Sequence, residues 1–323
     1  MRANSLQQKI YLSAIALVIL AGSATFFFFS QSQSATTINL PHDLGGPHAI
    51  SCQSASNCLV IGENYLAKGG FIGRATIGTN SISFTTLDRN LPVATSLSCY
   101  APDHCLTSFV SNSPSHALAQ FSPSSVAAKG VNYLQVPSQF QQVNAIFCLG
   151  NSSICLIAGK ASGNYHFAFQ LFSTVTKSFI GEPIVKTLSD IGGIYDMACD
   201  RSQRCLAIME NFDGTAGIVY AFSLQGLSPS NLSTLSFKAV ATPPANLLLT
   251  ISCSSASCLI GGSDASSIHG LLIKVNTADP SYPFQQITLP KSQGPILAVS
   301  TANKTIIGGY PVYSNYGDLV GIS

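Results

Sequence analysis

The chain alternates short apolar stretches with small polar loops, and one local pattern recurs along its length. An apolar stretch leads to a Cys, a polar loop of four to six residues follows, and a second Cys opens another apolar stretch. The five copies are AISCQSASNCLVIG, SLSCYAPDHCLTSF, AIFCLGNSSICLIAG, DMACDRSQRCLAIM and TISCSSASCLIGG. Their first cysteines lie 47, 49, 51 and 54 residues apart. A period near 50 residues indicates a repeat protein.

Each repeat predicts four short strands. In the first unit these are HAISC, CLVIG, FIGRATIG and ISFTTL, and in the fifth LLTISC, CLIGG, GLLIKV and FQQITLP. Turn-forming residues separate them. A four-stranded unit of this length matches a β-propeller blade. A β-helix coil is about half as long, and tandem immunoglobulin-like domains need a Cys-Trp-Cys pattern, whereas this chain has no Trp.

The two ends of the chain predict that the ring closes. A sixth copy, LAVSTANKTIIGG, has Thr301 and Thr305 at its two Cys positions. This last unit lacks one strand, and TTINLP at residues 36–41 resembles the missing one. We therefore predict an all-β, six-bladed propeller over residues 36–323, whose N-terminal strand completes the last blade and removes an exposed edge. The blades are expected to start near residues 49, 96, 145, 196, 249 and 296.

The N-terminus has the features of an export signal. Arg2 and Lys9 precede an apolar run over residues 10–29, which predicts one N-terminal hydrophobic helix long enough to cross a bilayer. Residues 1–29 are interpreted either as an uncleaved signal anchor or as a signal peptide cleaved after Ala24, with a buried soluble helix as a third interpretation. Residues 30–35 form a polar tether. Both export interpretations place the propeller outside the cytoplasm, in the periplasm, at the cell surface or secreted.

The composition excludes several classes of protein. Charged residues make up 9% and hydrophobic residues 46%, which is unlike a disordered chain. With 15 basic and 13 acidic residues the chain does not resemble a nucleic-acid binder. We expect a monomeric ring that contacts the membrane only through residues 10–29.

The ten cysteines are predicted to form one disulfide within each of five blades. The pairs are Cys52/Cys58, Cys99/Cys105, Cys148/Cys155, Cys199/Cys205 and Cys253/Cys258. Close Cys pairs also form halves of zinc sites, but here each pair belongs to a different blade. Export makes disulfides plausible, and we expect neither a metal nor a cofactor.

The recurring motif SC-x4–6-C-L-x-x-G resembles the cysteine-stapled propeller repeats of exported bacterial proteins. These belong to the broad group of sialidase-like and photosystem-assembly-factor-like propellers, and the resemblance covers residues 36–323. Sialidases of this group carry S-x-D-x-G-x-T-W boxes and an arginine triad. This chain has no such box, and its exported part has only Arg74, Arg89, Arg201 and Arg204. The resemblance therefore implies the fold and argues against sialidase activity.

One face of the ring is expected to bind ligands. The connections between blades and the loops between second and third strands meet on the face opposite the Cys loops. The candidate residues there are His42, Asp43, His48, Glu63, Asn64, Lys160, Glu210, Asp213, Asp264, His269 and Tyr313. Asp88, Arg89, Asp190 and Tyr316 lie in the same sets of loops.

These residues suit two catalytic interpretations. His42, Asp43 and His48 suit a metal or acid–base cluster, but a turn at Asp43 flanked by solvated histidines is favoured. Glu63 and Glu210 suit the carboxylate pair of a glycoside hydrolase, but polar loop residues on opposite sides of the ring are favoured. Asp213 and Asp264 are predicted to form turns.

The sequence contains no GxSxG, HExxH, P-loop or calcium-loop motif. It therefore favours an exported propeller that serves as a binding or scaffold module for a protein or glycan. The alternatives are a carbohydrate- or lactone-type hydrolase with its site at the channel mouth, and a purely structural envelope protein.

Overall fold

The computed structural model describes residues 35–322 apart from short segments, and the predicted N-terminal helix lies outside the described residues. The segments left out are residues 55, 65–68, 79–80, 112–113, 127–129, 149–152, 163–165, 189–190, 212–215, 227, 229–230, 302–304, 313 and 315. Within the described part, two short 3-10 turns, η1 (Pro114–His116) and η2 (Leu232–Thr234), accompany the strands. None of the helices found there is long and apolar enough to cross a membrane.

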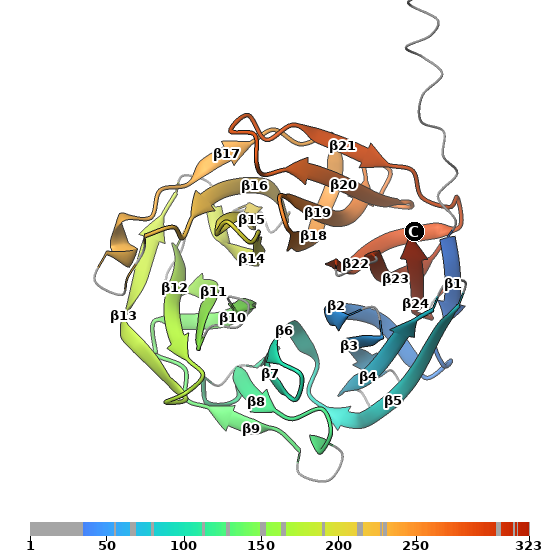
Figure 1. Ribbon diagram of the computed structural model, residues 1–323, viewed down its shortest axis with the longest axis horizontal. Coiled ribbons are helices and arrows are strands. Elements are labelled where there is room, and N and C mark those ends of the chain that lie inside the picture. Colours follow the sequence, from blue (N-terminus) through green and yellow to red (C-terminus); the bar gives the residue numbers. More distant parts are fainter. Residues whose placement is uncertain are drawn as a thin grey trace, which may run out of the picture. The chain divides into compact units, whose positions relative to one another are not determined.

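The strands form six antiparallel four-stranded sheets arranged as the blades of a ring (Figure 1). Blade one contains β2 (Leu44–Ser54), β3 (Asn57–Asn64), β4 (Gly69–Ile77) and β5 (Ile82–Leu91). Blade two contains β6 (Ala94–Ala101), β7 (His104–Phe109), β8 (Leu118–Phe121) and β9 (Asn132–Leu134). Blade three contains β10 (Phe140–Cys148), β11 (Ile154–Ala161), β12 (His166–Ser173) and β13 (Ser178–Thr187). The first strand of each blade is the innermost.

The second half of the chain repeats this arrangement. Blade four contains β14 (Ile191–Cys199), β15 (Arg204–Asn211), β16 (Ala216–Ser223) and β17 (Lys238–Val240). Blade five contains β18 (Ala245–Ser254), β19 (Ser257–Asp264), β20 (Gly270–Asn276) and β21 (Phe284–Ile287). Blade six contains β22 (Gln293–Thr301), β23 (Thr305–Pro311), β24 (Asp318–Ile322) and β1 (Ala35–Asn39). The prediction of an all-β, six-bladed propeller is confirmed.

The N-terminal strand closes the last blade, as predicted. β1 pairs with β24 in a register that runs from Ala35 opposite Ile322 to Asn39 opposite Asp318. Blade six is thus assembled from both ends of the propeller sequence. This pairing covers the edge that β24 would otherwise expose.

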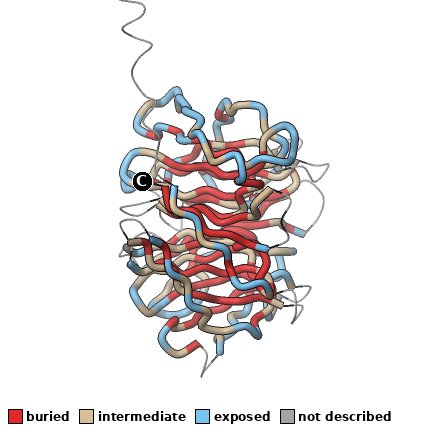
Figure 2. Tube along the Cα trace, turned by 90° about the vertical axis from the view of Figure 1, so that its right-hand side faces the viewer, coloured by how far each residue is buried: buried red, intermediate tan, exposed pale blue. Residues whose placement is uncertain are grey.

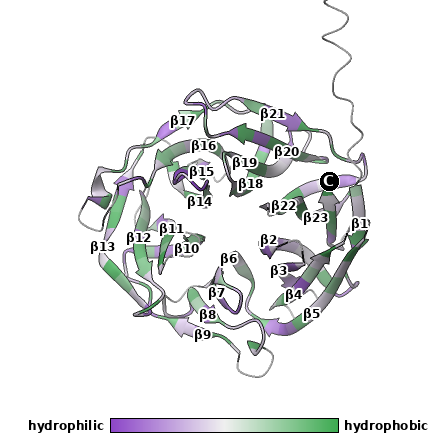
Figure 3. Cartoon of the chain, in the orientation of Figure 1, coloured by the Kyte–Doolittle hydropathy of each residue, from purple (hydrophilic) through white to green (hydrophobic). Residues whose placement is uncertain are grey.

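The hydrophobic core lies between neighbouring blades. One cluster joins Val60 and Phe71 of blade one to Ile306 and Leu319 of blade six, and similar clusters join the other neighbours. Buried residues run along the strands, while exposed residues gather at the loops (Figure 2). Hydrophobic residues recur along the strands of every blade (Figure 3). Because its two neighbours cover both faces of each sheet, the chain needs few charged residues.

In blades three and five, the glycine that ends the C-L-x-x-G motif lies opposite a bulge in the innermost strand. The register between β10 and β11 shifts between Val143 and Ala145, and a Cβ on Gly159 would lie 2.0 Å from the Gln142 carbonyl oxygen. At the equivalent bulge of blade five, a Cβ on Gly262 would lie 2.0 Å from a backbone oxygen. At these two bulges a Cβ would force a shift of the backbone, whereas the equivalent bulges of blades two and four hold Phe109 and Met209.

All five predicted disulfides are present. Each joins two residues that lie directly opposite each other in the first hairpin of a blade, with Cα atoms 3.9 to 4.0 Å apart. The bonds are Cys52–Cys58, Cys99–Cys105, Cys148–Cys155, Cys199–Cys205 and Cys253–Cys258. No described cysteine is free. Five disulfides point to an oxidising, extracytoplasmic environment.

The second cysteine of each pair lies deeper than its position beside a polar loop suggests. The five residues are Cys58, Cys105, Cys155, Cys205 and Cys258, and the exposed fraction of each is 0%. Each belongs to one of the apolar clusters between blades. The reason is that the second strand of a blade lies between the first and third strands and is covered by the adjacent blades.

Candidate functional site

Side chains of the innermost strands connect the blades around the channel. The residue directly before the first Cys position is Ser in four blades, and its hydroxyl accepts a backbone N–H from the next blade. These bonds run from Cys99 N to Ser51 Oγ, Cys148 N to Ser98 Oγ, Thr301 N to Ser252 Oγ and Cys52 N to Ser300 Oγ, at 3.1 to 3.2 Å. The Ser of the recurring SC motif is therefore an inter-blade contact.

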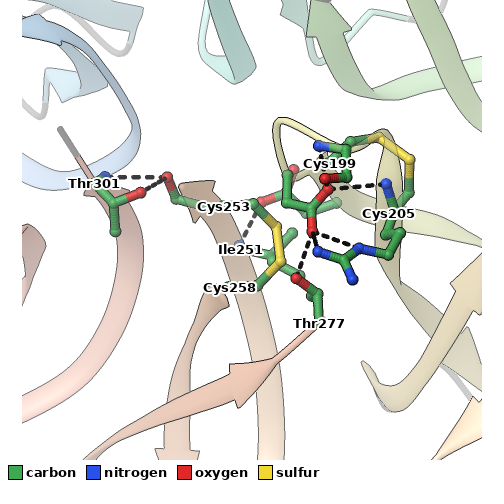
Figure 4. Close-up of a disulfide and its surroundings, with 12 residues drawn as sticks. Cys199, Cys205, Ile251, Cys253, Cys258, Thr277 and Thr301 are labelled. Atoms are coloured by element: carbon green, nitrogen blue, oxygen red, sulfur yellow. Dashed lines mark hydrogen bonds and ion pairs between the residues drawn. A yellow bond between two sulfur atoms is a disulfide. The ribbon is translucent and has the colours of Figure 1, made fainter. Parts of the chain in front are cut away.

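A second tier of bonds lies two residues earlier on the same strands. Ile146 N donates to Ser96 Oγ at 3.1 Å, and Val299 N donates to Thr250 Oγ1 at 3.2 Å. Between blades four and five the acceptor is a carboxylate, since Ile251 N donates to Asp196 Oδ2 at 2.8 Å. Figure 4 shows this contact beside the disulfides of blades four and five.

The disulfides connect this channel wall to the core and are not part of an exposed site. Cys52 and Cys253 on the innermost strands line the central cavity. Their partners face the apolar clusters between blades and have no exposed surface, as do the second cysteines of the other three pairs. These buried residues, which a ligand on the surface of the ring cannot contact, are Cys58, Cys105, Cys155, Cys205 and Cys258. Among the predicted residues, the cysteines therefore have a structural role, as the sequence indicated.

Asp196 faces the channel and was not among the residues selected from the sequence. Its Oδ1 accepts the N–H of Met197 at 2.8 Å, and the Thr250 hydroxyl also donates to the carboxylate. Burial raises the pKa of Asp196 to about 7, against the lowering effect of these hydrogen bonds. The equivalent positions of the other blades hold Ala, Ser or Thr. In the sequence, Asp196 is therefore marked only as the one carboxylate at this position of the repeat.

A second buried carboxylate lies on the disulfide-bearing face. Asp200 accepts hydrogen bonds from Arg204 Nε at 2.9 Å and from Thr277 Oγ1 of blade five at 2.6 Å (Figure 4). These bonds and the Arg204 charge lower the pKa of Asp200, although desolvation is the largest effect and opposes them. Because both carboxylate oxygens are used within the protein, this cluster fastens the Cys loop of blade four to blade five.

On the opposite face, several of the predicted residues meet near the start of blade one. His48 Nε2 lies 3.2 Å from Glu63 Oε1, and His48 Nδ1 lies 3.1 Å from the carbonyl oxygen of Ala94. The hydrogen bond from His48 lowers the pKa of Glu63. Each ring nitrogen of His48 thus has a partner within the protein, so His48 bridges β3 and β6.

The neighbouring loops add an ion pair and an aromatic contact. Asp43 and Arg89 form an ion pair, and Asn64 Nδ2 donates to the carbonyl oxygen of Arg89 at 3.0 Å. The His42 ring meets the exposed Tyr316 ring edge-on, with centroids 4.5 Å apart. The three predicted residues His42, Asp43 and His48 therefore have three different partners.

The remaining candidates lie in other sectors of the ring. A Cβ on Gly193 would lie 3.4 Å from Lys160 Cβ and 3.7 Å from Glu210 Oε2, so these residues of blades three and four flank one glycine. Glu210 and Glu63 lie on blades four and one, and none of the ion pairs or hydrogen bonds of the described residues joins them.

Asp264 and His269 belong to one tight loop of blade five. Asp264 accepts the Ser266 hydroxyl at 2.6 Å, which lowers the pKa of Asp264, and its backbone N–H donates to the His269 carbonyl oxygen at 3.0 Å. Asp213, Tyr313 and Asp190 lie outside the described residues. The described residues contain no group of three or more His, Cys, Asp and Glu side chains able to hold a metal ion.

Six four-stranded blades closed by the N-terminal strand define a disulfide-stapled β-propeller. No protein-family model matches the sequence, and no curated protein matches it. Among solved structures, hydrazine synthase of Kuenenia stuttgartiensis is similar with a TM-score of 0.55 at 8% identity, over 87% of this chain and 97% of that chain. YjhT is similar with a TM-score of 0.56 at 9% identity, over 88% of this chain and 95% of that chain. These likenesses show a shared fold.

Proposed function

We propose that the protein is an exported, membrane-tethered propeller that binds a protein or glycan partner. The partner docks on the face opposite the disulfides, over the loops where blades six and one meet. The membrane segment is residues 10–29, followed by the polar tether. The five disulfides support an extracytoplasmic location.

The observation that carries this proposal is the gathering of His42, Asp43, Arg89 and Tyr316 on one exposed surface. The Tyr316 side chain and the partly exposed Arg89 provide an aromatic ring and a guanidinium, two groups that dominate binding surfaces. The ion pair with Asp43 and the ring contact with His42 hold both groups in place before a partner arrives. Such pre-organisation lowers the entropic cost of binding.

A hydrolase receives less support from the described residues. Glycoside hydrolysis needs two carboxyl groups about 5–10 Å apart with a raised pKa on the acid. Glu63 instead pairs with His48, which lowers the pKa of Glu63.

The test compares three forms of the full-length protein in detergent on a glycan array and against extracytoplasmic protein extracts. These are the wild type, an Arg89→Ala/Tyr316→Ala variant, and an Arg201→Ala control on the disulfide-bearing face. Arg201 is exposed, so its removal leaves the fold intact. We expect a ligand that the wild type and the control bind and the double variant binds at least tenfold more weakly. Equal binding by all three forms would refute the docking surface.

A further inference from the structure

The centre of the ring contains a cavity of about 170 Å³. Residues of all six innermost strands line it, near the two tiers of inter-blade hydrogen bonds. Asp196 is the only titratable side chain among the described lining residues, because the lining cysteines Cys52 and Cys253 are in disulfides. The cavity thus has one carboxylate and no basic group in its wall.

This carboxylate has no counter-ion among the described residues. None of the three ion pairs found there includes Asp196, and its three hydrogen bonds come from neutral donors. Tyr195 is next to Asp196 on β14, and its pKa is raised first by burial and then by the charges of Asp196 and of Glu210 on β15. A partly buried carboxylate without a positive partner is costly, so a cationic ligand would gain from binding beside it.

The rest of the wall divides into two sectors with different chemistry. Hydroxyls of Ser51, Ser98, Ser252 and Ser300 form one sector. Each oxygen that accepts a backbone N–H keeps a second lone pair that can accept another donor. In blades three and four the equivalent positions hold Phe147 and Ala198, which form an apolar sector of the wall. An aromatic ring beside a carboxylate favours an organic cation over a hydrated one.

We propose that this cavity binds the ammonium group of a small primary amine, with Asp196 as counter-ion. The ammonium donates to the carboxylate and to serine hydroxyls, while the carbon atoms of the amine lie against Phe147. A divalent metal fits less well, because no second carboxylate or imidazole is among the described residues that line the cavity. The site lies within the ring, separate from the docking surface proposed above, and does not depend on it.

Two kinds of ligand carry such an ammonium group: a free small amine and the lysine side chain of a protein. The experiment therefore titrates full-length protein in detergent at pH 8 with ethylammonium chloride, with N-acetyl-lysine amide and with potassium chloride, by calorimetry. Two variants accompany the wild type. Asp196→Asn removes the charge and keeps an acceptor for the Ile251 N–H, and Asp264→Asn removes a carboxylate from a distant loop.

We expect the wild type and Asp264→Asn to bind ethylammonium alike, and Asp196→Asn to bind it at least tenfold more weakly. Potassium should bind more weakly than ethylammonium. Binding of ethylammonium but not N-acetyl-lysine amide identifies a free amine as the source, whereas equal binding admits a lysine side chain. An unchanged affinity in Asp196→Asn, absent binding in the wild type, or equal binding of potassium would each overturn the proposal.

A second measurement covers the case in which Asp196→Asn does not fold. In the wild type, ethylammonium must lower the pH at which the Asp196 carboxyl titrates, followed by carbon NMR of aspartate-labelled protein. The reason is linkage, since a cation binds the ionised carboxylate better than the neutral acid. A titration that ethylammonium does not move contradicts the site.

Discussion

The Asp196 carboxylate accepts the backbone N–H of Ile251 at 2.8 Å, across the boundary between blades four and five. Fifty-five residues separate the two in sequence, close to one repeat. At the same register Thr250 holds blade six by a neutral hydroxyl. This tier of inter-blade hydrogen bonds thus combines neutral contacts with a single titratable one. The contact between blades four and five should therefore make the stability of the protein depend on pH.

The first prediction concerns the pH dependence of stability in Asp196→Asn. The folded pKa of about 7 lies above the value of about 3.9 for an unfolded chain. Between these pH values the native state holds a proton that the unfolded state has released, so the wild type loses stability as pH rises. The variant lacks this loss. The free energy of unfolding of the variant, relative to that of the wild type, should therefore increase from pH 4 to 7 by at most about 4 kcal/mol. Above pH 7 the difference should stay constant.

Urea unfolding at several pH values measures this difference. Asp264→Asn is the control, because hydrogen bonds lower the pKa of that carboxyl in the folded state. The free energy of unfolding of Asp264→Asn, relative to that of the wild type, should decrease slightly as the pH rises from acidic values. A difference between Asp196→Asn and wild type that does not change with pH would show that Asp196 is ionised throughout.

The second prediction concerns the serine of the recurring motif. Ser98→Ala removes the acceptor of the Cys148 N–H in the next blade and should lower the free energy of unfolding by about 1 kcal/mol. Ser83→Ala on the outer strand β5 changes an exposed residue and should cost less than about 0.5 kcal/mol. Chemical denaturation of both variants makes the comparison. Equal effects would mean that water replaces the lost hydroxyl at no cost.

The third prediction concerns the disulfides. Cys148→Ala/Cys155→Ala should lower the free energy of unfolding by about 2 kcal/mol, because the short crosslinked loop becomes free in the unfolded chain. Thr301→Ala/Thr305→Ala changes the equivalent pair of blade six, which has no bridge, and should cost about 1 kcal/mol or less. Denaturation under oxidising conditions compares the two. A larger loss in blade six would show that its threonines stabilise the closure more than a disulfide does.

The repeat made the architecture predictable from the sequence. Cysteine pairs at intervals near 50 residues marked the first hairpin of each blade, and TTINLP supplied the closing strand. The contacts of Asp196 were not predictable in this way. They depend on which residues of adjacent innermost strands come into register, and the bulges after Ile194 and Leu248 set that register.

The candidate face was predicted as a set of loops but not as a set of contacts. The blade order brought Asp43 and Arg89 to one face, yet their ion pair depends on the path of the β1–β2 connection. His48 and Glu63 lie on adjacent strands, and only the register shift between Pro47 and Ala49 fixes how the His48 ring meets the carboxylate. Loop geometry and bulges are set by local packing, which residue type alone does not reveal.

The fourth prediction tests the bulge itself through Gly159→Ala. The new methyl group would lie 2.0 Å from the Gln142 carbonyl oxygen and 3.0 Å from the Asn144 backbone nitrogen, so β10 must move away from β11. Such overpacking costs about 1–3 kcal/mol, and the shift would also strain the Asn144 contact to the Ile194 carbonyl oxygen. Gly217→Ala is the matched control, because no atom lies within 4 Å of a Cβ placed there. We expect thermal unfolding to show a clear decrease in Tm for Gly159→Ala and none for Gly217→Ala. The same Tm in both variants would mean that β10 moves to accommodate the new methyl group without loss of stability.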